Sequence, residues 1–196
     1  RSLAVSIAYN SCDRKHEEKR MGVLCMEPLF FIRRPNEILD LWGHKPKTLS
    51  LYSRKKLSLY EQNDMPYVSD ALQRLTGCQI SAEALFFSDN RQELYMEFPE
   101  LAEQYIAIAD DGQGDLWLMN LQNGEICFFD HGEWEHPLTE LHIDFKKFVQ
   151  LADLIAQWEC FLNTDAQDTS KQEELIWDEM RKLDKELPEK YPFSLK

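Results

Sequence analysis

Residues 105–131 read Tyr105-Ile-Ala-Ile-Ala-Asp-Asp-Gly-Gln-Gly-Asp-Leu-Trp-Leu-Met-Asn-Leu-Gln-Asn-Gly-Glu-Ile-Cys-Phe-Phe-Asp-His131 and predict three short strands joined by two glycine-containing turns. The first turn contains Gly112 and Gly114, which permit positive φ angles. The second turn is Asn123-Gly124, the dipeptide that antiparallel hairpins prefer. The stretch therefore predicts an antiparallel meander in the middle of the chain.

The sequence around this meander predicts the layers of the fold. The strand 116–121 is apolar on both faces, which indicates a central strand that is covered on both sides. Asp144 is expected to cap a helix whose apolar positions form one stripe, namely Phe145, Phe148, Val149, Leu151, Ala152 and Ile155. The predicted class is α+β: an antiparallel sheet of about four to six strands packed against helices.

The flanking segments have weaker patterns. A helix over 66–76 is expected, after Asp64 and before Gly77, and a strand over 84–87. The remaining expectations are a short helix over 36–42 capped by Asn36, an undecided strand or helix over 47–60, a helical or irregular piece over 92–98, a turn over 100–104, a polar loop over 130–137, a charged helix over 171–186 and an extended tail over 187–195. We divide the chain into a basic, partly ordered N-terminal extension (1–60), an α+β domain (61–160), and a polar linker with an appended helix and tail (161–196).

Charge is distributed unevenly along the 196 residues, whose net charge is −13. Residues 1–60 contain 12 Lys and Arg against 6 Asp and Glu, whereas residues 61–196 contain 10 against 29. An acidic surface disfavours nucleic acid as a partner and favours a basic protein. Solubility alone would also account for the acidity, and the basic segment could pack against the acidic remainder. The sequence contains no run of 18 apolar residues, so no membrane-spanning segment is expected.

The five cysteines, at positions 12, 25, 78, 127 and 160, are scattered and form no CxxC pair. Their odd number and spacing favour reduced thiols in the cytoplasm. None has a His or Lys next to it in sequence that would activate a nucleophile. The chain begins with Arg, and its weakly apolar first nine residues are not expected to be a signal peptide.

The acidic loop after the first central strand has a structural and a metal-binding interpretation. Asp110, Asp111 and Asp115 could hold calcium, but their spacing lacks the alternating ligands and terminal Glu of an EF-hand. We interpret them as carboxylates that form the turn. The pair Gly112 and Gly114 lacks the third glycine of a dinucleotide-binding loop.

The next loop is rich in histidine and acid. His131, His136 and His142 have spacings that match no zinc template, so surface positions are expected and no metal or other cofactor is predicted. Trp134 lies between Glu133 and Glu135, and a large aromatic residue among charges is typical of an interface anchor. The alternative is that Trp134 folds back on the sheet.

Three segments together resemble the SUKH superfamily, a group of bacterial immunity proteins related to a fungal regulator of cell-wall glucan synthesis. They are Ile106 to Leu121 with its Asp-Asp-Gly-Gln-Gly-Asp turn, Asn123-Gly to His131, and Ile143-Asp-Phe-Lys-Lys-Phe-Val-Gln-Leu151. Met65-Pro-Tyr67 and Leu75-Thr-Gly77 resemble the Leu-Pro-x-x-Tyr helix of the family and its Asn-Gly end. The likeness covers about residues 64–156, and its departures are Thr76, Asn120 and Ile143-Asp144, where the family has Asn, Asp and Ser.

The resemblance implies an immunity protein that binds and occludes a cognate toxin domain without catalysing a reaction. The acidic charge makes a basic nuclease toxin the expected partner. The residues expected to contact it are Asp110, Asp111, Asp115, Asp130, Glu133, Trp134 and Glu135. The alternative is a regulatory or scaffolding protein of the fungal type. An enzyme is not expected, because no nucleophile, base and orienting group can be named together.

Overall fold

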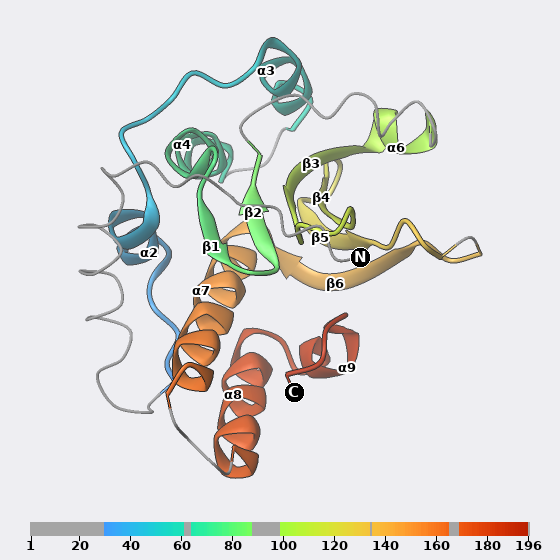
Figure 1. Cartoon of the computed structure of the whole chain (residues 1–196). Coiled ribbons are helices and arrows are strands. Elements are labelled where there is room, and N and C mark those ends of the chain that lie inside the picture. The colour runs from blue at the N-terminus through green and yellow to red at the C-terminus, as the bar shows by residue number, and fades with distance from the viewer. Residues whose placement is uncertain (1–29, 61–63, 88–98, 134, 165–168, 196) are drawn as a thin grey trace, which may run out of the picture.

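The fold is built on a six-stranded antiparallel sheet in which each strand pairs with the next one along the chain (Figure 1). The computed structural model describes residues 30–60, 64–87, 99–133, 135–164 and 169–195. The strands are β1 (Gln79–Ser81), β2 (Ala84–Phe86), β3 (Tyr105–Asp110), β4 (Leu116–Asn120), β5 (Glu125–Phe129) and β6 (Leu138–Asp144). The sheet and its helices confirm the predicted α+β class.

Along the chain, helices come before, between and after the strands. They are α2 (Pro35–Trp42), α3 (Leu51–Leu57), α4 (Met65–Leu75), α6 (Pro99–Gln104), α7 (Phe145–Leu162), α8 (Ser170–Leu183) and α9 (Leu187–Lys190). In Figure 1, α7 runs beneath the β1–β2 hairpin and α8 lies beside α7. None of these helices is long and apolar enough to cross a membrane.

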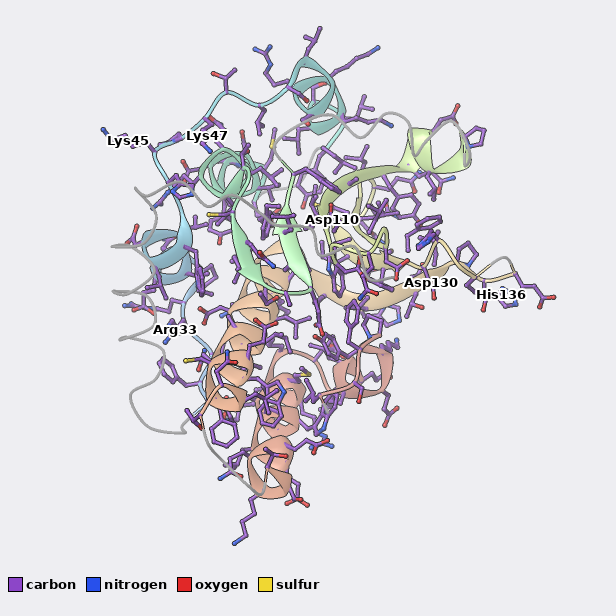
Figure 2. All side chains as sticks on the ribbon, in the orientation of Figure 1. Arg33, Lys45, Lys47, Asp110, Asp130 and His136 are labelled. Carbon is purple, nitrogen blue, oxygen red and sulfur yellow. The ribbon has the colours of Figure 1, made fainter. Side chains whose placement is uncertain are left out.

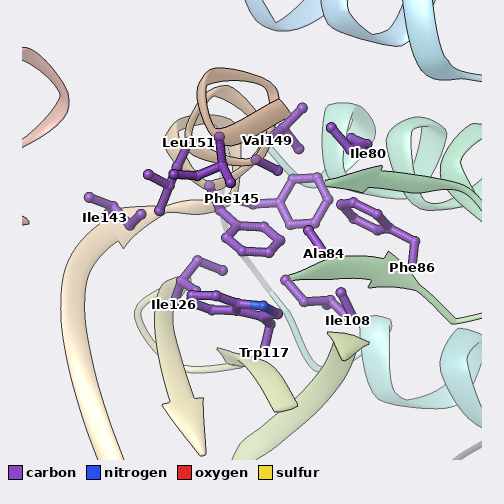
Figure 3. Packing of buried hydrophobic residues seen from close by; sticks show 14 of the residues in the cluster. Ile80, Ala84, Phe86, Ile108, Trp117, Ile126, Ile143, Phe145, Val149 and Leu151 are labelled. Carbon is purple, nitrogen blue, oxygen red and sulfur yellow. The ribbon is translucent and has the colours of Figure 1, made fainter. Parts of the chain in front are cut away.

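The main core lies between α7 and the sheet. Figure 3 shows Phe145 and other α7 side chains directed at residues of the strands. The ring centroid of Phe148 is 5.0 Å from that of Trp117 and 6.0 Å from that of Phe86. Full burial of each such ring contributes roughly 1.5–3 kcal/mol to folding. The apolar stripe predicted for this helix is therefore the face that holds the sheet.

A second, smaller core covers the opposite face of the sheet. Its buried members are Leu101 of α6 together with Tyr105, Leu116, Leu118, Cys127 and Phe129. Trp117 and Met119 of the same strand β4 belong to the main core. The prediction that this strand is central and covered on both faces is confirmed.

Local signals explain where two of the helices begin and end. Asp144 caps α7, because its carboxylate accepts a hydrogen bond of 2.8 Å from the backbone N–H of Lys147. In α4, Pro66 occupies the first turn, where its missing N–H costs nothing. The chain leaves α4 at Gly77, which has a φ of 74°. Both predicted helices are confirmed, although Asp64 makes no side-chain cap.

The described N-terminal segment is attached to α7 by a buried polar network. Asp153 is fully buried and accepts hydrogen bonds of 2.8 Å from Arg33 and from Trp42 Nε1. Gln157 donates to Asp153 and also to the carbonyl of Phe31, each at 2.9 Å. Residues of α2, α8 and α9 belong to the main core as well, so the core does not break at residue 60 or at residue 161.

Several local expectations differ from the structure. β1 and β6 were not expected, the turn predicted over 100–104 is α6, and the tail predicted from 187 begins with α9. The undecided segment 47–60 contains α3, and Arg34 rather than Asn36 caps α2. Apolar and polar residues do not alternate regularly along β6. The pairing of β6 with β5 shifts register, and His142 has a φ of 56°. The piece expected over 92–98 lies outside the described residues.

The cysteines do not share one state. Cys78 and Cys127 are buried reduced thiols, as expected. Cys160 is disulfide-bonded, so the expectation of reduced thiols is wrong for this residue. Burial raises the pKa of Cys127 to about 12, because a thiolate would lose its solvation there. This thiol therefore stays protonated at neutral pH.

Candidate functional site

The candidate site is a cavity of about 540 Å³ that we call the acidic cleft. Three segments far apart in sequence supply most of its lining: the β3–β4 loop, the β5–β6 loop and the chain after α9. Its lining residues are Asp111, Gln113, Asp115, Phe128, Asp130, Glu133, Glu135, His136, Thr139, Pro192 and Phe193. Five of these are carboxylates, and two are aromatic rings. The cleft thus combines a strong negative charge with an apolar wall.

The cleft lies away from the basic part of the molecule. In Figure 2, Asp130 and His136 extend to one side, and Lys45 and Lys47 extend to the other. The exposed Lys and Arg residues between α2 and the end of α3 are Lys45, Lys47, Arg54 and Lys55. Among the described residues, the acidic cleft and the exposed Lys45 and Lys47 therefore lie on different sides of the molecule.

Hydrogen bonds within the β3–β4 loop fix its carboxylates. One oxygen of Asp111 accepts the backbone N–H groups of Gln113, Gly114 and Asp115 at 2.8, 3.1 and 3.1 Å. Asp110 accepts the N–H of Gly112 at 2.9 Å. The two glycines have φ angles of 77° and 118°, as predicted. Asp110 and Asp111 thus form the turn, which agrees with the structural interpretation of these residues.

Asp115 connects the two acidic loops. Its Oδ1 accepts the backbone N–H of His131 at 3.0 Å and lies 2.6 Å from the ring nitrogen Nδ1 of the same residue. The hydrogen bond with Asp115 is the main reason that the pKa of His131 is raised above its usual value. Protonated His131 then partly offsets the charge of Asp115.

The β5–β6 loop supplies the exposed rim of the cleft. Asp130 accepts the N–H of Gly132 at 2.8 Å, and Glu133 accepts the N–H of Glu135 at 3.1 Å. Each of these carboxylates uses one oxygen to shape the loop. The side chain of Glu135 is exposed and lines the cleft together with His136.

The chain after α9 supplies the third wall. We call residues 191–195 the C-terminal strap. The hydroxyl of Tyr191 is hydrogen-bonded to the carboxylate of Glu83, in the β1–β2 turn. Phe193 packs against Phe128 and Trp117, with ring centroids 5.2 and 6.1 Å apart. The strap therefore belongs to the folded domain and completes the cleft.

Two groups of side chains among the described residues could approach a cation. The ligand atoms of Asp115, Asp130 and His131 lie within 4.8 Å of one another, as do those of Glu125, Glu140 and His142. In the first group, Asp115 already contacts the ring nitrogen of His131. A metal ion would have to displace a proton from a ring whose pKa is raised. This contact does not favour a metal at that group.

The structure brings together five of the seven residues expected to contact a partner: Asp111, Asp115, Asp130, Glu133 and Glu135. Asp110 is buried at the end of β3 and does not line the cleft. Trp134 lies outside the described residues. Sequence reasoning missed Pro192 and Phe193, which follow the acidic loops by about 60 residues. The feature of the sequence that could have indicated these two residues is a proline next to aromatic residues in a charged tail.

Comparisons of the chain with protein-family models, curated proteins and solved structures find no match.

Proposed function

We propose that the protein is a non-enzymatic immunity protein that binds a cognate toxin domain, such as a basic nuclease, through the acidic cleft. The observation that carries the proposal is the convergence of five carboxylates from two loops on one cavity. The resemblance of residues 105–151 to the SUKH superfamily supports the same class of function.

The mechanism is electrostatic and steric occlusion. A nuclease holds its substrate with Lys and Arg side chains, because phosphates need positive partners. A cleft lined by carboxylates competes for those cations and speeds association through its long-range field. The remainder of the domain then covers the surface that the substrate would use.

The hydrogen bonds of the site groups support the part of this proposal that excludes turnover. Asp111 and Asp115 each accept backbone hydrogen bonds that shape their loops. A carboxylate held in this way is a poor general base, because protonation would weaken the turn. Cys127 is buried, and its pKa of about 12 keeps the thiol protonated.

The proposal includes a cytoplasmic location. The disulfide at Cys160 argues against this location, because disulfides persist mainly in oxidising compartments. Fractionation of the source cells tests it: the protein is expected with cytosolic markers. Recovery from a secreted or envelope fraction would contradict this location and leave the binding role in place.

The test of function uses the protein encoded next to this one in its genome. We expect the two proteins to co-purify at low salt, and the complex to weaken as salt screens the charges. The double variant Glu133→Gln/Glu135→Gln keeps the loop hydrogen-bond acceptor and removes two charges. We expect it to lower the association rate about tenfold at low salt.

The matched control carries the same change on α8, in Glu173→Gln/Glu174→Gln. It should alter the association rate less than about twofold, because these residues do not line the cleft. Equal effects of the two double variants would show that only net charge matters. A complex that forms without inhibiting a toxic activity would instead favour the regulatory or scaffolding role.

A further inference from the structure

The C-terminal strap gives the acidic cleft a feature that charge alone does not provide. Its two ends are fixed: Tyr191 by Glu83, and Leu195 by a hydrogen bond of 3.1 Å from Trp158 Nε1 to its carbonyl. Phe193 lies between these anchors, and its ring also contacts that of Tyr191 at a centroid distance of 5.7 Å. The ring is half-buried and lines the cavity. An aromatic surface is thus held in place beside five carboxylates.

The size of the cavity argues for a side chain rather than a bare ion. A volume of about 540 Å³ is many times the share of one water molecule in the liquid, which is about 30 Å³. A compact ion would use the carboxylates and leave the Phe193 wall without a role. A long cationic side chain would place its aliphatic stem along the rings and its charge among the acids.

The two basic side chains differ in how well they fit this combination. The ammonium of lysine is compact and strongly hydrated, so it gains little from an aromatic wall. The guanidinium of arginine is planar and weakly hydrated. It can stack on an aromatic ring while it donates paired hydrogen bonds to a carboxylate.

We propose that the acidic cleft selects arginine over lysine side chains of its partner, and that Phe193 makes this selection. The inference rests on the proposed binding function and specifies the chemistry of the partner. Carboxylates from the two loops attract either cation, and the ring on the strap distinguishes between them. The chain after α9 is therefore part of the binding surface.

The test compares fluorescently labelled hexa-arginine and hexa-lysine peptides, which have the same length and side-chain charge. Their dissociation constants for the full chain are measured by fluorescence anisotropy at low ionic strength. We expect wild-type protein to bind hexa-arginine about fivefold more tightly. Phe193→Leu keeps an apolar wall without a ring and should reduce this ratio to about one, with hexa-lysine binding nearly unchanged.

Three variants serve as controls. Phe31→Leu makes the same change at a ring that is 48% exposed and does not line the cleft, so the preference should persist. Phe193→Tyr keeps a ring and should also keep the preference for hexa-arginine. This variant still tests the inference if the leucine variant folds poorly. Glu133→Gln/Glu135→Gln should weaken both peptides by the same factor.

The outcomes separate this inference from the proposed function. If wild-type protein binds both peptides equally, the selection of arginine is wrong and the acidic cleft stands as a binding site for cations. If the preference survives in the folded Phe193→Leu variant, the assignment to Phe193 is wrong. If neither peptide binds, both the electrostatic function and the inference fail.

Discussion

At the scale of single residues, Asp111 organises the acidic loop through one carboxylate oxygen. That oxygen accepts three backbone N–H groups, and the residue as a whole is buried. Removing the acceptor leaves those donors without a protein partner, so Asp111→Ala should lower the free energy of unfolding by about 1–3 kcal/mol. Asp111→Asn keeps the oxygen and should lose less. Urea unfolding measures both variants, and equal losses would show that the charge, not the acceptor, stabilises the turn.

Gly124 combines a backbone conformation that favours glycine with a close neighbour. Its φ is 75°, and a Cβ atom there would lie 2.5 Å from the Tyr60 hydroxyl oxygen. Gly112 has a φ of 77°, but a Cβ atom added there would have no neighbour within 4 Å. Its substitution therefore measures the cost of the backbone conformation alone. We expect Gly112→Ala to cost about 1 kcal/mol and Gly124→Ala about 1–3 kcal/mol more.

Thermal or urea unfolding of both alanine variants gives this difference. Tyr60→Phe removes the atom that is nearest to the added Cβ, so part of the Gly124→Ala loss should be recovered in the double variant. Equal losses at the two glycines would mean that Tyr60 moves aside without cost.

Sequence patterns predict residues well where the cause is local. The glycine turns and the Asp144 cap depend on neighbours within four residues, and both were predicted. The contact of Tyr191 with Glu83 joins residues that are 108 positions apart, and no local pattern indicates it. The same reason explains why Phe193 was not expected at the cleft.

At the scale of elements, Asp153 connects the segment before α2, the end of α2 and α7. It is a fully buried carboxylate that pairs with Arg33 and accepts from Trp42 Nε1. Asp153→Leu leaves the guanidinium of Arg33 buried without its partner, so we expect a loss of about 3–5 kcal/mol in the free energy of unfolding.

A double-mutant cycle tests whether these two residues act as a pair. Arg33→Met/Asp153→Leu removes both charges and should cost clearly less than the sum of the single changes. Additive losses in urea unfolding would show that the ion pair does not connect the elements.

The elements that sequence patterns missed are those set by tertiary pairing. Tyr105 to Phe129 forms three strands with glycine turns, and the sequence defines them. β6 begins after a polar loop and pairs with β5 through a register shift, so its alternation is irregular. α6 is six residues long and offers too few positions for a helical period.

At the scale of the whole molecule, stability should depend on pH through Glu83. Burial raises the pKa of this carboxyl group to about 7, above its usual 4.5. The folded state therefore binds the proton more tightly than the unfolded state does. The associated stability is fully present below about pH 4.5 and is lost as the pH rises through about 7.

Glu83→Gln keeps a polar partner for Tyr191 and removes this titration. The free energy of unfolding of the wild type, relative to the variant, should fall by up to about 3 kcal/mol between about pH 4 and pH 8. Urea unfolding across this range measures it. A constant difference between the two proteins would mean that the group does not titrate in the folded state.

The proposed binding role belongs to the whole molecule, because three segments line the cleft and Lys45 and Lys47 lie on another side. Composition predicted an acidic surface and a basic partner. It did not predict that the carboxylates surround a cavity, since that depends on how the strap returns to the sheet.

Nuclear magnetic resonance titration of the ¹⁵N-labelled full chain with hexa-arginine locates the binding surface. Amide shifts are expected at Gln113, Gly114, Gly132, Thr139 and Phe193, which line or adjoin the cleft. They should be nearly absent in Glu133→Gln/Glu135→Gln and unchanged in Glu173→Gln/Glu174→Gln. Shifts centred on α8 or spread evenly over the acidic surface, with the cleft amides unmoved, would contradict a binding site in the acidic cleft.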